Sequence, residues 1–293
     1  MNGEQTPLAR IASDFAENRV ALAGLAMLAL ILLAAIFAPA ISPQNPYDLA
    51  QLDVLDSRLP PGAHGTEGKT YWLGTDDQGR DMLSAIFYGL RTSIGVGVAS
   101  TAGGLAIGLV LGLVAAYFGG WIDSLVMRTV DIQLSFPAIL IALVLLALLG
   151  QGLDKIVVAL IAVQWAYYAR TVRASALVER GKEYIEAATG LALSPVRIVF
   201  RHLLPNCLPP LIVVATVQIA AAIALEATLS FLGLGLSITE PSLGLLIANG
   251  FTYLLSGKYW ISFFPGIALL LTIVGINLVG DQLRDVLNPR LQT

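Results

Sequence analysis

Long stretches without a single Asp, Glu, Lys or Arg alternate with shorter polar segments along this 293-residue chain. The charge-free runs lie at residues 20–47, 92–122, 132–153, 156–169, 202–225 and 259–280. A helix needs about 20 residues to cross about 30 Å of hydrocarbon, and all but the fourth run reach that length. The fourth run can still span the membrane if Lys155 and Arg170 extend outward and the helix continues past Arg170. The pattern predicts an all-α polytopic membrane protein with about six transmembrane helices.

The first run is expected to remain in the protein as a transmembrane helix. Ala38-Pro39-Ala40 is similar to a signal-peptidase site, but the apolar stretch exceeds the core of a signal peptide and acidic residues precede it. The chain is then expected to divide into a cytoplasmic N-terminus at 1–19, the first transmembrane helix at 20–41, an outer (periplasmic) loop at 42–91, a core with five transmembrane helices at 92–281 and a cytoplasmic tail at 282–293.

The second half of the outer loop has the pattern of a short amphipathic helix. Thr75 can cap its start, and the apolar face comprises Met82, Leu83, Ile86, Phe87 and Leu90. Next to a span, such a helix is expected to lie along the membrane surface as an interfacial helix. A gating role is the alternative, and amphipathicity alone specifies neither.

Composition and the placement of charge agree with this organisation. Apolar residues make up 56% of the chain and charged residues only 13%, against about 25% charged in soluble domains. If the N-terminus is cytoplasmic, the inner segments hold 11 Lys and Arg and the outer segments hold 6. Basic residues are enriched in cytoplasmic loops, so both termini and the basic segment 170–201 are predicted to be cytoplasmic.

Three local patterns suggest architecture within the spans. Gly104, Gly108 and Gly112 repeat at four-residue spacing, which indicates a face where another helix packs closely, in this chain or another. Arg128 and Asp131 lie one turn apart and can pair. Pro137, near the start of the third run, is expected to kink the helix.

Glu226 is the carboxylate that stands in otherwise apolar sequence, which makes it a possible intramembrane polar site. It lies about 24 residues beyond His202, or roughly 36 Å along a helix, so a paired structural role near the outer mouth of the span is favoured. A proton-coupled carrier, the alternative class, would be expected to show several such groups or inverted repeats.

The residue inventory argues against catalysis by this chain. A single Cys207 and two histidines supply neither a disulfide framework nor a metal cluster. No G-x-x-x-x-G-K-[ST] phosphate loop and no G-x-S-x-G motif occurs. The chain is therefore expected to be no enzyme and to bind no cofactor.

The basic segment between the fourth and fifth runs has the start and stop signals of two short helices. Glu183 to Ala188 is helix-forming and meets Gly190, after which Ser194-Pro195 can start a second helix that ends near Leu204, before Pro205. A solvated inner loop or a lipid-binding patch would explain the basic residues, but not this pairing of helices.

Glu186-Ala187-Ala188, followed by Leu204-Pro205, resembles the EAA loop of ATP-binding-cassette importer permeases. Further segments resemble the C-type permease of dipeptide, oligopeptide and nickel importers. They include Leu73-Gly74-Thr75-Asp76, Gly79-Arg80-Asp81, Ser135-Phe136-Pro137, Tyr168-Ala169-Arg170, the run from Leu229 to Gly235, Pro241-Ser242, Gly280-Asp281, Arg284-Asp285 and Pro289-Arg290.

The resemblance implies a type I importer permease core with an additional N-terminal helix, in the inner (plasma) membrane of a bacterium. It would form half of a pathway for peptides or related small solutes, with nickel or glutathione as alternative cargo. The implied partners are a second homologous permease, two cytoplasmic ATP-binding subunits that hold ATP and Mg, a periplasmic or extracellular substrate-binding protein and membrane lipid, but no nucleic acid.

In that family the EAA loop, here about 180–206, docks on the ATPase. The residues carried over for this coupling role are Glu186, Ala187, Ala188, Gly190, Ala192, Ser194, His202, Leu204 and Pro205. The sequence departs from the general pattern at two of them. Ala192 stands where the pattern has glycine, with Gly190 two places earlier, and His202 stands where the pattern has isoleucine.

Overall fold

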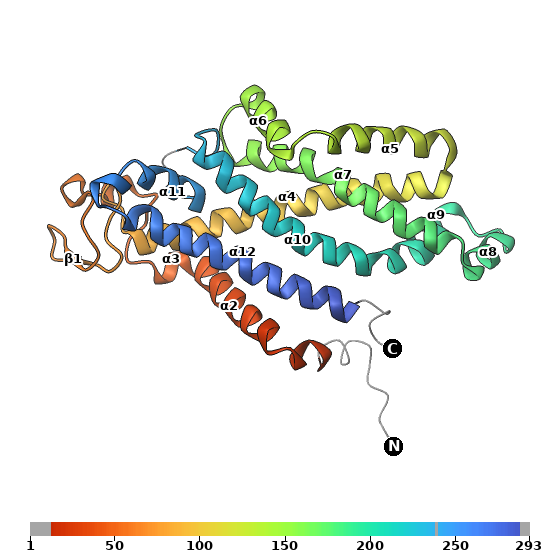
Figure 1. Ribbon diagram of the computed structural model, residues 1–293, viewed down its shortest axis with the longest axis horizontal. Helices are drawn as coiled ribbons and strands as arrows, with labels where there is room; N and C mark the ends of the chain where they lie inside the picture. Colours follow the sequence, from red (N-terminus) through yellow and green to blue (C-terminus); the bar gives the residue numbers. More distant parts are fainter. Residues whose placement is uncertain (1–12, 238–239, 288–293) are drawn as a thin grey trace, which may run out of the picture.

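The computed structural model describes residues 13–237 and 240–287. Within this part of the chain the long helices are α4 (Met82–Phe118), α7 (Leu153–Arg180), α10 (Leu204–Phe231) and α12 (Trp260–Leu287). They lie side by side in an elongated bundle, with α8 (Glu183–Gly190) beyond one end and α11 and β1 at the other (Figure 1). These are called below the α8 end and the α11 end.

The small residues of α4 pack against α7, as their spacing predicts. A Cβ added at Gly108 would lie 2.5 Å from the carbonyl oxygen of Trp165, and one at Gly112 would lie 2.6 Å from that of Ala169. Only glycine permits this approach of two backbones, which in lipid is a main source of helix association. The partner of the glycine face is therefore within this chain.

The first span lies against the last. α2 (Arg19–Ile36) packs on α12, where Gly24 faces Leu278, and a short helix α3 (Ala38–Ile41) follows it. The Asn18 side chain caps α2 by accepting from the next backbone N–H groups, and its amide donates to Gln282 Oε1 at 2.7 Å. The start of α2 and the end of α12 are thus held together.

The third charge-free run does not form a single kinked helix. α5 (Gly120–Leu134) and α6 (Ala138–Leu149) are separate helices bent by 91° at the Ser135-Phe136-Pro137 break. Proline lacks the N–H that would continue α5 and restricts the residue before it, so the chain turns sharply there rather than kinking.

The predicted pair between Arg128 and Asp131 also differs. Asp131 instead pairs across to Arg170 of α7 at 2.5 Å, and Asp123 pairs with Arg173. The Asp131 carboxylate faces α7, so it meets the guanidinium of Arg170 rather than that of Arg128 on its own helix. These two pairs tie α5 to α7.

The segment between α3 and α4 is a small, largely irregular unit. It contains 3₁₀ turns η1 (Leu49–Gln51) and η2 (Val54–Asp56) and a two-stranded antiparallel sheet of β1 (Ala63–His64) and β2 (Thr70–Tyr71). The buried Asp56 carboxylate holds it together by accepting from Thr66 N and Tyr71 Oη.

The predicted interfacial helix is not a separate element. Its residues from Met82 onward are the first turns of α4, capped by Asp81 rather than Thr75. Met82, Ile86 and Leu90 are buried against protein, because this apolar face packs on α2, α11 and α12. The apolar face that suggested a membrane surface is therefore part of the core.

A short helix closes the α11 end. α11 (Leu243–Phe251) follows α10 after a turn, and the 3₁₀ turn η4 (Leu254–Ser256) leads into α12. Gly250 lies against the start of α12, where a Cβ would be 2.5 Å from Ser262 N. α11 is too short to cross a membrane and packs inside the end of the bundle.

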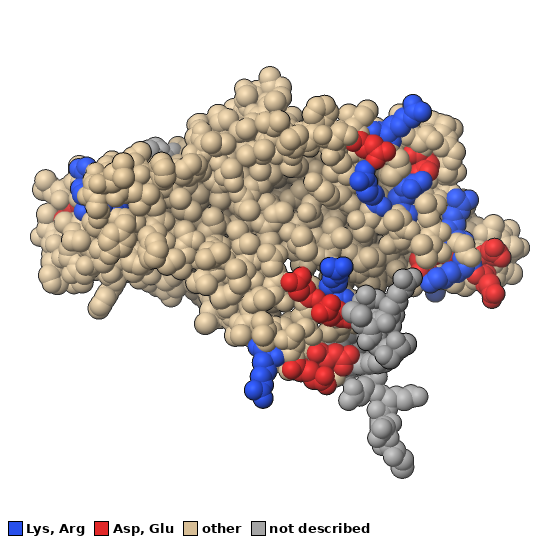
Figure 2. All heavy atoms as spheres, viewed as in Figure 1, with Lys and Arg blue, Asp and Glu red and all other residues tan. Residues whose placement is uncertain are grey.

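Length and composition identify the candidate membrane spans. α2, α4, the continuous helix Pro195–Phe231 and α12 qualify singly, and the bent pair α5 and α6 qualifies together. α7 is 28 residues long but carries charges near both ends, and contains the fourth charge-free run. On the face drawn in Figure 2, charged side chains gather mainly toward the α8 end, and a broad uncharged band lies between the two ends.

Candidate coupling site

α8 projects beyond the bundle at the end of α7 (Figure 1). Glu183 and Glu186 stand in its first turn, where carboxylates interact favourably with the helix dipole. One face packs inward, since Ile185 and Ala188 are buried in a cluster with Ile198 of the following helix. Glu186 and Ala187 are exposed on the other face. Of the predicted coupling residues on this helix, Glu186 and Ala187 therefore face the surroundings, whereas Ala188 packs inward.

α8 ends in a Schellman turn centred on Ala192. Leu193 N donates to Ala188 O at 3.2 Å, and Ala192 N donates to Thr189 O at 2.9 Å. This turn requires a left-handed residue at the position after the cap, and Ala192 has φ +54°. Gly190 is still helical and does not supply the turn. The glycine of the general family pattern thus corresponds to a position with positive φ, which alanine occupies here.

The second short helix begins as predicted but does not end before Pro205. Ser194 caps α9 (Pro195–Ile198) by accepting from Arg197 N at 3.4 Å. The chain then passes through one π-helical turn, η3 (Val199–Leu203), directly into α10. His202 and Leu204 are half-buried in this junction and Pro205 is exposed in the first turn of α10. The coupling segment is therefore continuous with a transmembrane helix.

A polar network fastens α8 to the two long helices beside it. Tyr184 Oη donates to Glu179 Oε2 at 2.7 Å, and Asn206 Nδ2 donates to Tyr184 Oη at 3.1 Å. Lys182 pairs with the other oxygen of Glu179 at 2.6 Å. Burial and the hydrogen bond to Glu179 raise the pKa of Tyr184 to about 12, so its hydroxyl stays protonated at physiological pH. Tyr184 joins the end of α7 to the start of α10.

The outer face of the coupling segment exposes large apolar side chains. Leu191 is 75% exposed, Val196 67% and Phe200 60%. All three lie on the same projecting segment as Glu186. An apolar patch on a charged protruding element marks a protein contact surface.

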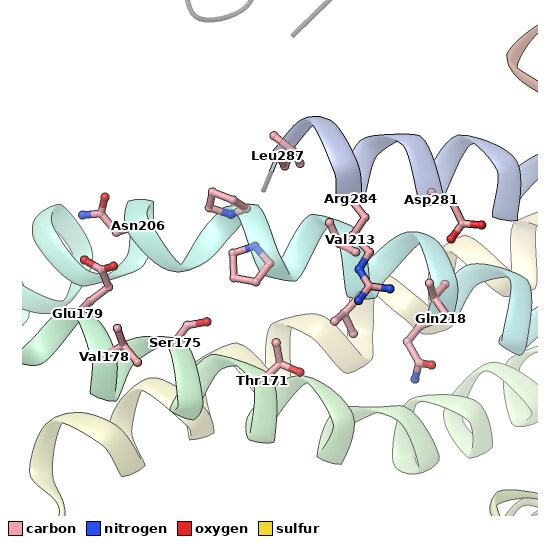
Figure 3. Close-up of a pocket in the computed structure, with 15 residues that line it drawn as sticks. Thr171, Ser175, Val178, Glu179, Asn206, Val213, Gln218, Asp281, Arg284 and Leu287 are labelled. Atoms are coloured by element: carbon pink, nitrogen blue, oxygen red, sulfur yellow. The ribbon is translucent and has the colours of Figure 1, made fainter. Parts of the chain in front are cut away.

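A cavity of about 780 Å³ lies between α7, α10 and α12 toward the α8 end. Thr171, Ser175 and Glu179 line it from α7, and Asp281 and Arg284 line it from α12. Its α10 wall carries Asn206, Pro209, Pro210, Val213, Val214, Val217 and Gln218. Figure 3 shows Arg284 directed from α12 toward α10, with Glu179 and Asn206 at the other end of the cavity.

Glu226 lies elsewhere, in a closed cluster near the α11 end. Its carboxylate accepts from Ser93 Oγ at 2.9 Å and from Ser230 Oγ at 2.8 Å, and Ser242 also hydrogen-bonds to it. Ser93 in turn accepts from Leu243 N. The residue is fully buried and does not border the cavity. It joins α4, α10 and the start of α11, in line with the structural interpretation.

Sequence reasoning missed the Tyr184 network and the cavity. Tyr184 and Asn206 are 22 residues apart and no motif links them, although the Glu179 and Lys182 spacing could have suggested an ion pair. Asp281 and Arg284 were recognised as part of a motif without a role. Among the described residues, no group of three or more His, Cys, Asp or Glu could hold a metal ion.

Comparisons with known proteins agree with this arrangement. Residues 108–293 match the family described as binding-protein-dependent transport system inner membrane component, and residues 6–61 match the N-terminal transmembrane domain of oligopeptide transport permease C. The dipeptide transport system permease protein DppC of Alkalihalophilus pseudofirmus is 37% identical over 94% of this chain and 88% of its own length. A putative peptide transport system permease protein of Brucella abortus is 39% identical over 98% and 94%.

The fold has also been seen in a solved structure. A chain of the MetNI methionine ABC transporter in an inward-facing conformation superposes with a TM-score of 0.58 at 23% identity, covering 71% of this chain and 98% of that one. By its helices and its relatives, this chain belongs to the family of inner-membrane permease components of binding-protein-dependent transport systems.

Proposed function

We propose that this permease works with a second, similar permease chain, two ATP-binding subunits on the cytoplasmic side and a substrate-binding protein on the other side. ATP and Mg would be held by the ATP-binding subunits. The observation that carries the proposal is the projecting α8–α9 segment, which exposes Glu186 among Leu191, Val196 and Phe200. An ATPase surface with an apolar groove and a basic rim fits this segment.

The same segment is built to transmit force. Tyr184 holds α8 to Glu179 on α7 and to Asn206 on α10, and α9 continues through η3 into α10. A displacement of α8 by a closing ATPase dimer therefore moves two transmembrane helices together. Packed helices shift as rigid units rather than deforming, so this movement would open the pathway alternately to the two sides.

The orientation follows from the position of α8. If α8 docks on a cytoplasmic ATPase, the start of α2 and the end of α12 lie in the cytoplasm as well, and the outer segment with β1 and β2 faces the binding protein. The excess of Lys and Arg at the α8 end supports the same orientation. The relatives' names favour short peptides as cargo, with nickel or glutathione as alternatives.

The coupling role is tested by reversing one exposed charge. Glu186→Arg is expected to leave the protein inserted and folded, since the side chain is exposed, but to abolish uptake by placing a cation at the ATPase contact. Glu17→Arg is the matched control, because Glu17 is also exposed and lies outside the coupling segment. Uptake and ATP hydrolysis are measured in membranes that contain equal amounts of each variant. Normal uptake by Glu186→Arg would overturn the coupling assignment.

An ion-coupled secondary carrier is the second candidate class, and Glu226 is the observation that could favour it. Its buried carboxylate accepts hydrogen bonds from serine hydroxyls, and it does not line the cavity between α7, α10 and α12. A proton-coupling carboxylate needs access to water from each side in turn. The closed environment of Glu226 therefore favours the ATP-driven importer.

A further inference from the structure

Two of the sequence segments, Gly280-Asp281 and Arg284-Asp285, lie near the end of α12 and have no part in the proposed coupling role. At Gly280, α12 lies so close to α10 that an added Cβ would be 2.8 Å from Thr216 Oγ1. Gly280, Asp281 and Arg284 line the cavity of about 780 Å³ from α12. The close contact at Gly280 therefore borders the cavity, and the two charges stand on the same wall.

The two charged side chains on this wall are exposed. Neither Asp281 nor Arg284 forms a salt bridge with any residue in 13–237 or 240–287. By contrast, the carboxylates of Asp123, Asp131 and Glu179 each have a basic partner. Residues three apart on a helix lie on the same face with Cβ atoms about 5–6 Å apart, so Asp281 and Arg284 present opposite charges to the same cavity.

The remaining walls suit a peptide-sized molecule. The volume lies within the range of small-molecule sites, about 300–1,000 Å³. Val213, Val217 and Pro210 give the α10 wall an apolar surface for side chains, while Gln218 offers an amide that can both donate and accept. Such a mixture of an apolar surface with a few convergent polar groups is typical of ligand sites.

We propose that this cavity binds a short zwitterionic peptide, with Arg284 on the ligand carboxylate and Asp281 on its ammonium group. Arg284 presents a planar fork of donors that matches a carboxylate. The proposal rests on the proposed function, because the α8 end must face the cytoplasm for the site to bind peptide that has already been delivered there.

The cavity shares two residues with the hydrogen-bond network that holds α8, so a bound ligand can affect α8. Glu179 and Asn206 line the cavity, and both hydrogen-bond to Tyr184 of α8. A ligand that fills the cavity keeps α7, α10 and α12 apart at this end and holds the two residues that position α8. Peptide on the cytoplasmic side thus acts on the coupling segment and slows ATP hydrolysis, which limits further uptake.

The test uses the transporter purified with its partner chains in lipid nanodiscs, without binding protein. Radiolabelled dialanine is titrated and ATP hydrolysis is followed in parallel. Dialanine is expected to bind and to lower the hydrolysis rate. N-acetyl-dialanine, which lacks the ammonium group, and dialanine amide, which lacks the carboxylate, are each expected to compete about tenfold less well, from the loss of one charged contact.

The variants assign each end of the ligand to a residue. Arg284→Gln should weaken dialanine binding about tenfold and remove the preference for a free carboxylate, while Asp281→Asn should remove the preference for a free ammonium group. Asp285→Asn is the control, since Asp285 is exposed on the same helix but does not line the cavity. Tyr184→Phe should keep dialanine binding and lose its effect on hydrolysis.

The outcomes separate this inference from the proposed function. If the complex forms and hydrolyses ATP but binds no dialanine, or if Asp285→Asn weakens binding as much as Arg284→Gln, the site is wrong and the importer assignment stands. If anionic lipid alone protects the cavity from labelling of an Arg284→Cys variant and dialanine does not, the occupant is lipid and the proposal is overturned. If no ATPase accompanies the chain, the proposed function itself fails.

Discussion

Ala192 has a backbone conformation that costs an alanine about 1 kcal/mol relative to glycine. The contacts around Ala192 impose this left-handed conformation. The Schellman hydrogen bonds close the turn, and Leu193 packs against the cluster that contains Ala188 and Ile198. The turn therefore forms although the sequence departs from the general pattern here, with alanine in the position of glycine and with some strain.

Replacing this residue by glycine should stabilise the coupling turn. In Ala192→Gly, relief of the left-handed strain is expected to slow amide hydrogen exchange at Leu193 about fivefold, which corresponds to about 1 kcal/mol of local stability. Ala187→Gly is the matched control, since a glycine inside α8 should accelerate exchange by a similar factor. Faster exchange in Ala192→Gly would contradict the account of the turn.

At Glu226, the hydrogen bonds predict which substitution the protein tolerates. Glu226→Gln retains the size and an acceptor oxygen, so transport and the melting temperature of the purified transporter should change little. Glu226→Ala leaves buried serine hydroxyls without their acceptor, which should cost about 2 kcal/mol of stability. Loss of uptake in a stable Glu226→Gln protein would favour proton coupling instead.

At the scale of elements, apolar runs predicted which segments become helices, but not how the helices join. Residues 82–91 look like an independent amphipathic helix, because an apolar face has the same pattern whether it meets lipid or protein. The Ser135-Phe136-Pro137 break and the π-helical turn at Val199–Leu203 depend on packing against α7 and α10. The hydrophobic periodicity of a segment does not show which distant helices will pack against it.

The close contact between α4 and α7 predicts which glycine of α4 is required for stability. Gly108→Ala places a methyl group against backbone atoms of α7 and should lower stability by about 2 kcal/mol through overpacking. Gly95→Ala, on the same helix with open space around it, should be neutral or slightly stabilising. The measurement is the melting temperature of each purified protein. Equal melting temperatures would show that this close contact is not required.

For the whole molecule, the sequence indicated the class of protein and the two short helices of the α8–α9 segment, because both depend on contiguous residues. It did not indicate the cavity, whose walls come from residues 171–179, 206–218 and 280–287 on three helices. Nor did the sequence indicate that Glu179 and Asn206 both line the cavity and hydrogen-bond to Tyr184 of α8. Such features depend on how distant helices converge, which the charge-free runs do not specify.

The central claim, that this permease is driven by ATPases docked on the α8 end, is tested most directly by purifying the tagged chain from its native membrane. A mild detergent preserves the complex, and mass spectrometry identifies every retained protein. We predict one second permease-like chain and P-loop ATPases with the wild type, and the same second permease without the ATPases with Glu186→Arg. Recovery of the wild-type chain alone, or only with itself, would contradict the account.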